Sequence, residues 1–163
     1  MPNNQVAVHT PRGCTQVGDA TLQSGTTTST DCSSSSGCLV RENQQYSYGK
    51  GFAANGGGVY ALLIDISGIS VWFFPVCHTL LLFFFFFFFF DFTLPQRPSV
   101  PAVIQQATTS SIMDTATWGI PTAWYSNSTC DIETHFPPQV LELLTTLCGV
   151  WYVKRKSLCL AST

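Results

Sequence analysis

An all-β fold is what this sequence predicts, because its apolar residues come in short runs that turn-forming residues separate. Gly, Ser, Asn and Pro bound these runs, and the runs are rich in β-branched and aromatic side chains. The sequence has no long segment with an apolar period of about 3.6 residues, the period that predicts an amphipathic helix. Its 163 residues are enough for one ordinary domain.

The first predicted element is a strand over residues 5–10, whose sequence is QVAVHT. Side chains alternate between the two faces of a strand, so Val6 and Val8 share one face. Gln5 and His9 then share the opposite, polar face. This pattern is typical of a strand with one buried and one exposed side.

The clearest element is a β-hairpin in the middle of the chain. Residues 59–65 (VYALLID) and 69–74 (ISVWFF) are two apolar runs, and Ser67 and Gly68 between them suit a tight turn. Residues 14–58 are rich in turn formers and hold three cysteines, which predicts a long loop held by a disulfide. Residues 97–129 also read as a loop.

Cysteine usage favours an oxidising compartment. None of the cysteines forms a C-x-x-C pair, so a zinc site or a thioredoxin-like site has little support and disulfides are expected instead. The triplet Asn127-Ser128-Thr129 is an N-glycosylation sequon, which agrees with secretion. Against this, the N-terminus has neither the basic start nor the apolar stretch of a signal peptide.

Charge and motifs exclude several classes of function. Charged residues make up only 10% of the chain and its net charge is −2, so no nucleic-acid partner is predicted. Gly56–Gly58 lacks the Lys and the following helix of a phosphate loop, and no cofactor is predicted. Asp131, Glu133 and His135 alternate and would share a strand face as a metal site or carboxylate pair, but we favour a plain strand or loop there and predict no metal. Nothing in the sequence indicates an oligomeric state.

An apolar run of 11 residues extends from Leu80 to Phe90. A membrane-spanning helix needs about 20 residues, and runs of about 10–14 usually have another role. Extension of the run back to Val71 reaches that length but includes Pro75 and His78. A single-pass membrane protein through residues 71–90 is therefore a weak alternative.

Several sequence blocks occur in a fixed order and identify a family. They are NQVAVHT-x-x-GC at 4–14, SYGKGFAANGGGVYAL at 47–62, ISVWFFP at 69–75, TWGIPTAWYSNSTCDIETHF at 117–136 and LCGVW at 147–151. The series resembles the fungal laminarinase-like, endo-1,3(4)-β-glucanase branch of glycoside hydrolase family 16. Because several separate blocks match in order, the resemblance is far more specific than any single motif. It covers most of residues 4–151.

The resemblance implies a β-jelly-roll sandwich of the concanavalin-A type, whose concave sheet binds a β-glucan chain. It implies retaining hydrolysis of β-1,3- or mixed-linkage glucan by a secreted enzyme, with glucan as the partner and no cofactor. Substrate-binding candidates are Gln5, His9 and Trp72. Gln5 and His9 are either glucan ligands or ordinary exposed polar positions. For Trp72, as for Trp118 and Trp124, the alternatives are stacking on sugar or packing in the core, and packing is the commoner outcome in a sandwich.

Catalytic residues are the main departure from the family pattern. The family carries its nucleophile and its acid/base in an E-x-D-x-x-E segment, which comes immediately before the strand matched here by NQVAVHT. This chain begins at that point and holds no such segment elsewhere. We therefore expect an incomplete jelly roll and an inactive fragment of a β-glucan hydrolase, with a non-catalytic glucan-binding remnant as the alternative.

Two segments lie outside the family pattern. Removal of Val76 to Gln96 restores the family's WFFPR, and the segment fits an unspliced intron because its ends suit splice sites and its poly-Phe run suits a pyrimidine tract. Residues 152–163 are a non-family tail. Without the cysteines of these segments five remain, an odd number that predicts a missing partner: Cys14, Cys32, Cys38, Cys130 and Cys148.

Overall fold

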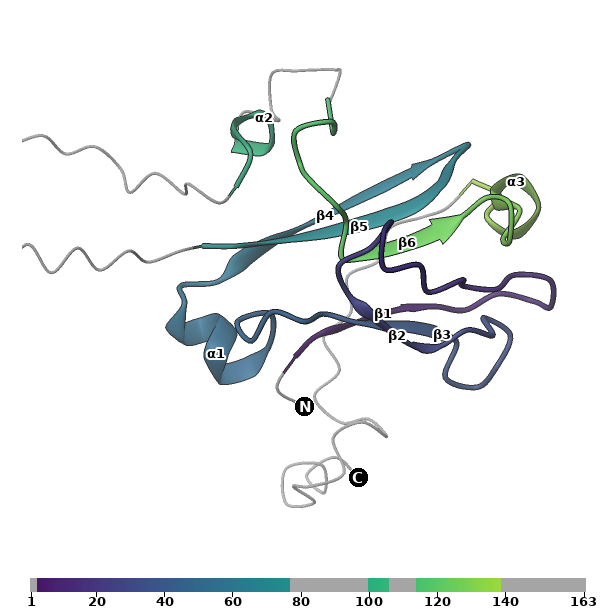
Figure 1. Ribbon diagram of the computed structural model, residues 1–163, viewed down its shortest axis with the longest axis horizontal. Coiled ribbons are helices and arrows are strands. Elements are labelled where there is room, and N and C mark those ends of the chain that lie inside the picture. Colours follow the sequence, from purple (N-terminus) through teal and green to yellow (C-terminus); the bar gives the residue numbers. More distant parts are fainter. Residues whose placement is uncertain (1–2, 77–99, 106–113, 139–163) are drawn as a thin grey trace, which may run out of the picture.

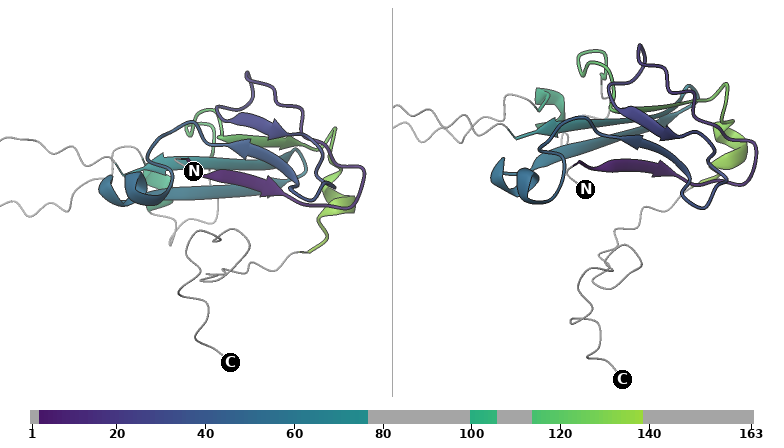
Figure 2. Two further views of the ribbon diagram at one scale, coloured as in Figure 1. Left: turned by 90° about the horizontal axis from the view of Figure 1, so that it is seen from below. Right: turned by 60° about the horizontal axis from the view of Figure 1, so that its bottom comes forward.

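The computed structural model describes residues 3–76, 100–105 and 114–138. Two antiparallel three-stranded sheets lie one over the other (Figure 1, Figure 2). The order of the first sheet is β1-β3-β2 and that of the second is β4-β5-β6. The strands are β1 (Gln5–Val8), β2 (Thr26–Ser29), β3 (Cys38–Arg41), β4 (Gly58–Asp65), β5 (Gly68–Pro75) and β6 (Ala123–Ser126). The described residues also form the short helices α1 (Gly49–Ala54), α2 (Ala102–Gln105) and α3 (Ile132–His135).

The predicted hairpin is confirmed as β4 and β5, which pair along their whole length from Gly58↔Pro75 to Asp65↔Gly68. The carboxylate of Asp65 closes the turn by accepting a hydrogen bond of 2.7 Å from the backbone N–H of Ser67. Gly68 has a φ of 148°, and a Cβ at this position would lie 2.1 Å from the carbonyl oxygen of Tyr125 in β6. The turn therefore requires Gly at the point where β6 joins the sheet.

The core lies between the two sheets. Val8 and Val40 of the first sheet pack against Ile69 and Val71 of the second. Tyr125 is fully buried among them, and its hydroxyl donates a hydrogen bond of 3.2 Å to the carbonyl oxygen of Val6. Burial raises the pKa of Tyr125 because the charged phenolate would lose its hydration. This side chain therefore fastens β6 to the first sheet.

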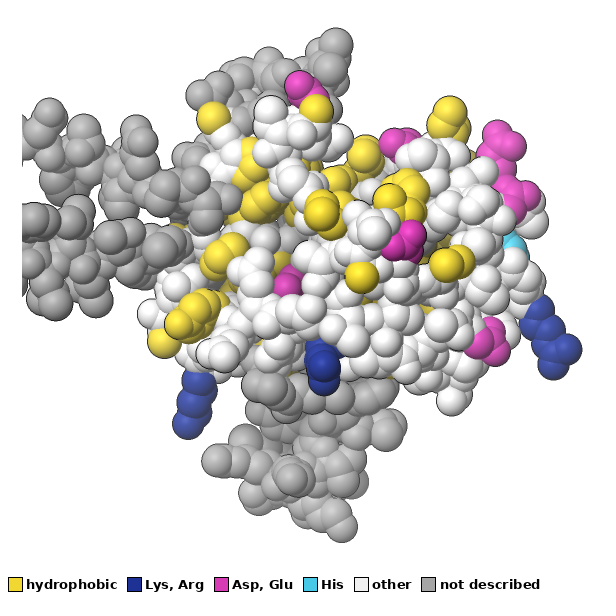
Figure 3. All heavy atoms as spheres, viewed as in Figure 1, with side chains coloured by type: hydrophobic (Ala, Val, Ile, Leu, Met, Phe, Trp, Pro, Cys, Tyr) yellow, Lys and Arg dark blue, Asp and Glu magenta, His cyan; other side chains and the backbone are white. Residues whose placement is uncertain are grey.

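A second apolar cluster covers the other face of β4 and β5. Trp72 and Phe74 meet the indole of Trp118 edge-on, with ring centroids 5.1 and 5.9 Å away. Val100 belongs to the same cluster, and Ile104 of α2 packs on it. Figure 3 shows hydrophobic side chains in the upper part of the face viewed there, and Lys and Arg side chains along its lower edge.

Four of the five candidate cysteines form two disulfides, Cys14–Cys130 and Cys32–Cys38. Cys148 lies outside the described residues. The prediction that residues 14–58 are one long loop was wrong, because β2, β3 and α1 lie within this range. Residues 97–129 are likewise more ordered than predicted, since they include α2 and β6.

The alternative that Asp131, Glu133 and His135 share a strand face does not hold, because these residues belong to a helical turn. Asp131 is the N-cap of α3, and Glu133 and His135 lie within the helix. Glu133 is two positions from each of the others and does not share their helix face, whereas Asp131 and His135 are four positions apart and lie on the same side of the turn. The three side chains therefore do not form one cluster.

The two segments predicted to lie outside the family pattern fall almost entirely outside the described residues. Of residues 76–96 only Val76 is described, and none of residues 152–163 is. Among the described residues no helix is long and apolar enough to cross a membrane. Residues 71–75, the start of the alternative membrane segment, belong to β5.

Candidate functional site

A groove of about 470 Å³ lies on the outer face of the first sheet. The N-terminal segment, β1 and the residue that follows β1 contribute Asn3, Asn4, Gln5, Ala7 and His9. Ser36, Leu39 of β3 and Tyr48 complete the lining. The groove thus has an apolar floor where Ala7 and Leu39 are direct cross-strand partners.

The alternation of β1 sends Gln5, Ala7 and His9 to this outer face while Val6 and Val8 turn toward the core. The predicted shared face of Gln5 and His9 is therefore present, and both side chains line one groove. The imidazole of His9 lies against Gly37, where a Cβ would stand 2.9 Å from its Cε1. Gly37 has a φ of 70°, so both the turn and the His9 ring favour Gly at this position.

The chain after β3 returns to β1 and carries Tyr48 to the groove. Ser47, which is buried, holds this return segment. Its hydroxyl accepts a hydrogen bond of 3.0 Å from the backbone N–H of Asn4 and donates one of 2.7 Å to the carbonyl oxygen of Gln44. The hydroxyl of Tyr60 in β4 donates to the carbonyl oxygen of Ser47 at 2.7 Å. Tyr48 therefore has a fixed backbone although its side chain is 53% exposed.

The chemistry of the groove suits a neutral ligand with many hydroxyl groups. Amides, an imidazole, hydroxyls and one phenol ring line it, and none of the described lining residues is Asp, Glu, Lys or Arg. Amides and imidazoles both donate and accept hydrogen bonds, as sugar hydroxyls require. No group of three His, Cys, Asp or Glu side chains that would hold a metal occurs in the described parts of the chain.

Trp72, the third substrate-binding candidate, lies elsewhere. It belongs to the second sheet and points away from the inner core, so it lies on the opposite side of the sandwich from Gln5 and His9. Its ring is only 6% exposed, and its indole N–H donates a hydrogen bond of 3.0 Å to the carbonyl oxygen of Gly119. In this structure Trp72 is a packing residue, and it does not join the groove.

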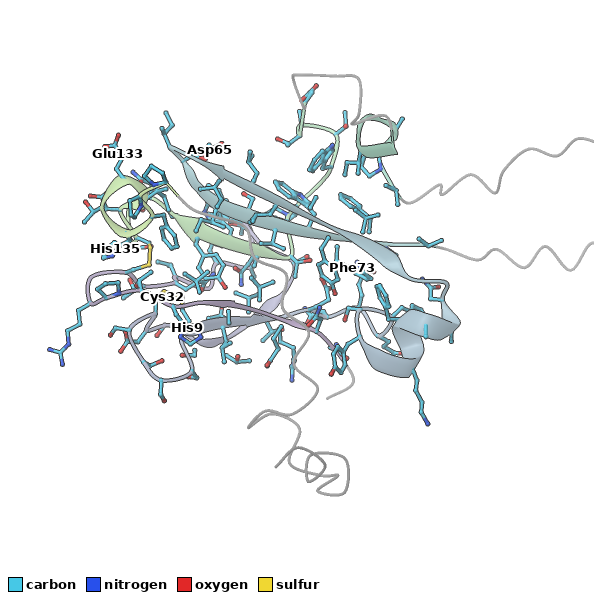
Figure 4. The ribbon with its side chains drawn as sticks, turned by 180° about the vertical axis from the view of Figure 1, so that it is seen from behind. His9, Cys32, Asp65, Phe73, Glu133 and His135 are labelled. Atoms are coloured by element: carbon cyan, nitrogen blue, oxygen red, sulfur yellow. A yellow bond between two sulfur atoms is a disulfide. The ribbon has the colours of Figure 1, made fainter. Side chains whose placement is uncertain are left out.

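Glu133 and His135 also lie away from the groove. Figure 4 shows His9 on the layer of the first sheet, whereas Glu133 lies beside Asp65 at the end of the second sheet. The Asp side chains at that end accept hydrogen bonds from residues close to them in sequence. Asp131, for example, accepts hydrogen bonds from the hydroxyl and the backbone N–H of Thr134, and these bonds lower the pKa of Asp131.

Asn127, the sequon residue, is exposed just after β6. Its side-chain oxygen accepts a hydrogen bond of 2.8 Å from the backbone N–H of Ile132, and its own N–H donates to the carbonyl oxygen of Ser67. The position is therefore both well ordered and accessible.

Sequence reasoning missed Tyr48 as a lining residue. It lies in a segment that was read as loop, and only the long-range bond from Asn4 to Ser47 brings it to the groove. The available signal was its place in the block SYGKGFAANGGGVYAL, which belongs to the family pattern.

The family described as "XgeA-like, catalytic GH16 domain" matches residues 1–79 and 85–161. A probable glycosidase of Schizosaccharomyces pombe is 31% identical over 155 residues, which are 91% of this chain and 31% of that protein. A probable endo-1,3(4)-beta-glucanase of Aspergillus niger is 35% identical over 151 residues, 91% of this chain and 16% of that protein. The chain thus spans less than a third of the length of these relatives.

A solved structure also has a similar fold. It is GH16 laminarinase 16A from Phanerochaete chrysosporium, with beta-glucans in donor and acceptor sites. Its TM-score is 0.61 at 32% sequence identity, over 82% of this chain and 39% of that one. At 32% identity the two chains are similar in sequence as well as in fold.

Proposed function

Because the chain belongs to glycoside hydrolase family 16, we propose that it forms part of a β-glucan hydrolase domain and binds β-1,3- or mixed-linkage glucan in the groove on its first sheet. The observation that carries this proposal is the shared lining of that groove by Gln5, His9 and Tyr48. Grooves that bind small ligands combine an apolar surface with a few convergent polar groups, and this groove has both.

We further propose that the 163 residues by themselves bind glucan without cleaving it. Retaining hydrolysis needs two carboxyl groups about 5–5.5 Å apart on either side of the scissile bond. The E-x-D-x-x-E pattern does not occur in the sequence, and the described groove residues supply no carboxyl group. Hydrolysis by a domain of this family would then depend on residues that this chain does not contribute.

The experiment is a binding measurement with laminari-oligosaccharides, which are β-1,3-linked glucose chains. The full chain is produced in an oxidising compartment as a soluble fusion to a small protein without a sugar site. Calorimetry or NMR gives the dissociation constant, and a reducing-sugar assay of the same sample gives hydrolysis. We expect saturable binding with no release of reducing ends.

Variants then assign the binding to the groove. His9→Ala together with Gln5→Ala should weaken binding at least about tenfold, since each removes hydrogen bonds to sugar hydroxyls worth about 1 kcal/mol. Gln45→Ala is the matched control, because Gln45 is exposed and lies outside the groove lining. Equal affinity in all variants would refute the groove, and release of reducing ends would refute the non-catalytic role.

We also propose that the chain is secreted and carries an N-glycan on Asn127. Support comes from the two buried disulfides, which require an oxidising compartment to form, and from the exposure of the sequon Asn. Expressed behind a signal peptide in a fungal host, the chain should lose mass on treatment with an endoglycosidase. The Asn127→Gln variant should already have the lower mass, and an identical mass before and after treatment would refute the modification.

A further inference from the structure

Building on the proposed glucan groove, we infer that Tyr48 is its specificity-determining residue: the phenol ring is a stacking platform that selects a β-linked pyranose of gluco configuration. Tyr48 is the one Phe, Tyr or Trp among the described lining residues of the groove. The other lining side chains supply hydrogen bonds or a small apolar floor, and neither of these offers a flat six-membered ring on which the face of a sugar can stack.

The backbone of Tyr48 is held from several directions. On its N-terminal side, Ser47 is buried and bonded to Asn4 and to Tyr60. On its C-terminal side the chain enters α1, whose Phe52 lies against Phe73 of β5 with ring centroids 6.3 Å apart. A platform that is already positioned loses little conformational entropy when a ligand binds, which favours affinity.

The ring itself remains open to solvent. Tyr48 is 53% exposed, whereas the rings of Tyr60 and Phe73 pack against each other with centroids 4.7 Å apart. An exposed aromatic ring in a polar groove presents an apolar face beside hydrogen-bonding groups, the combination that tyrosine supplies at binding sites.

The chemistry of the sugar provides the selectivity. In β-glucose every ring substituent is equatorial, so each face of the ring presents only C–H groups to an aromatic surface. Galactose and mannose each carry one axial hydroxyl, and stacking through the face that bears it would press this hydroxyl against the aromatic ring without a hydrogen-bond partner. Leaving a polar group unpaired in this way costs affinity, so stacking on Tyr48 discriminates between these sugars.

The test compares Tyr48→Ala, Tyr48→Phe and Tyr46→Ala in the full-length fusion. Laminaritetraose is the ligand, and β-linked mannotetraose is the comparison sugar. Tyr46 is the matched control because it is 50% exposed, lies two residues away and is not part of the groove lining. Circular dichroism and disulfide mapping establish that each variant has the fold of the unchanged chain.

We expect Tyr48→Ala to weaken laminaritetraose binding about tenfold, the factor that one aromatic stacking contact provides. Tyr48→Phe keeps the ring face and should bind within about twofold of the unchanged chain. Tyr46→Ala should bind normally. The preference for laminaritetraose over mannotetraose should shrink in Tyr48→Ala and persist in Tyr48→Phe.

The outcomes separate this inference from the proposed function. If Tyr48→Ala binds as well as the unchanged chain while the His9 and Gln5 variants do not, the groove stands and the stacking role is overturned. If Tyr48→Phe loses as much as Tyr48→Ala, the hydroxyl is the recognition element and stacking is again overturned. If the unchanged chain binds no glucan, both proposals fall together.

Discussion

The sulfur atoms of Cys14 and Cys32 lie 3.4 Å apart, although each belongs to a different disulfide. All four sulfurs of the two disulfides are buried in the core between the sheets. The sulfur of Cys14 therefore lies beside a second possible partner, the sulfur of Cys32.

Removal of Cys130 should allow Cys14 to pair with Cys32 instead. In the Cys130→Ser variant the free thiolate of Cys14 attacks the sulfur of Cys32, the Cys14–Cys32 bond forms, and Cys38 leaves as a thiolate that takes up a proton. Peptide mapping under non-reducing conditions, after oxidative refolding, should find the Cys14–Cys32 crosslink. Recovery of Cys32–Cys38 alone, with a free Cys14, would contradict the exchange.

Thr122→Val should destabilise the fold through Glu42. Glu42 is 2% exposed, and its carboxyl group accepts hydrogen bonds from the hydroxyl of Thr122 and from the backbone N–H of Gln44. Loss of the hydroxyl leaves a buried acceptor short of a donor, which costs about 1–3 kcal/mol of unfolding free energy. Urea denaturation of the variant measures this difference.

Two controls accompany this prediction. Thr122→Ser keeps the hydroxyl and should retain most of the stability. Thr21→Val removes a hydroxyl that bonds to Asp19 on the surface, and it should behave like the unchanged chain. Equal loss in the Thr122 and Thr21 variants would mean that burial of Glu42 plays no part.

Local patterns predicted the fold where each strand carries its own signal. The runs before and after Ser67 and Gly68 are apolar and β-branched, and they form β4 and β5 as predicted. By contrast, β2 has the sequence TTTS, which has no apolar period and looks like a loop. It is a strand because it pairs with β3, and no local pattern predicts that pairing.

The candidate site divides in the same way. Alternation alone predicted that Gln5 and His9 share a face, because the period of a strand is a local property. Tyr48 reaches the groove only through the bond between Asn4 and Ser47, whose positions are 43 residues apart. In α3 the alternation of DIETH was misleading because the cap formed by Asp131 and Thr134 starts a helical turn there.

Stability at low pH should depend on Asp131. Hydrogen bonds from Thr134 lower the pKa of Asp131 below its ordinary value of 3.8, so the folded chain favours the charged carboxylate. This contribution is present above the unfolded pKa and is lost as the pH falls through the lower folded pKa. The stability difference between the unchanged chain and Asp131→Asn should therefore shrink below about pH 4.

Urea denaturation from pH 7 to pH 2 provides the measurement for this carboxylate. Asp131→Ala is the companion variant, because Ala removes the N-cap acceptor at every pH whereas Asn keeps it. A constant difference between the unchanged chain and Asp131→Asn across the range would contradict the role of the charge.

We propose that residues 76–96 do not belong to the domain and derive from an unspliced intron. Phe74 and Val100, on either side of this segment, pack in the same cluster, so the chain has returned to the end of β5 by residue 100. We expect the mature transcript to lack these 21 codons and to join Pro75 to Arg97. Sequencing of the transcript is the measurement, and a message that retains the poly-Phe codons would refute the proposal.

The corresponding deletion tests the same idea on the protein. A chain without residues 76–96 keeps Arg97 to Ser99 to connect Pro75 with Val100, a link that spans at most about 14 Å. It should fold with both disulfides and be more soluble than the full chain, because it lacks the apolar run of 11 residues from Leu80 to Phe90. Loss of the disulfide pairing on deletion would mean that the segment is part of the fold.

The disulfide between Cys14 and Cys130, which are 116 positions apart in sequence, turns most of the described chain into a covalent circle. A protease that cuts once anywhere inside this circle opens it without dividing the molecule. The two pieces then stay in one molecule, because the Cys14–Cys130 disulfide still joins them. The hydrogen bonds between Thr15 and Thr129 beside the disulfide also hold the strands β2 to β6 together. Under oxidising conditions, such a molecule tolerates a single cut within the circle that would divide an uncrosslinked chain of the same sequence in two.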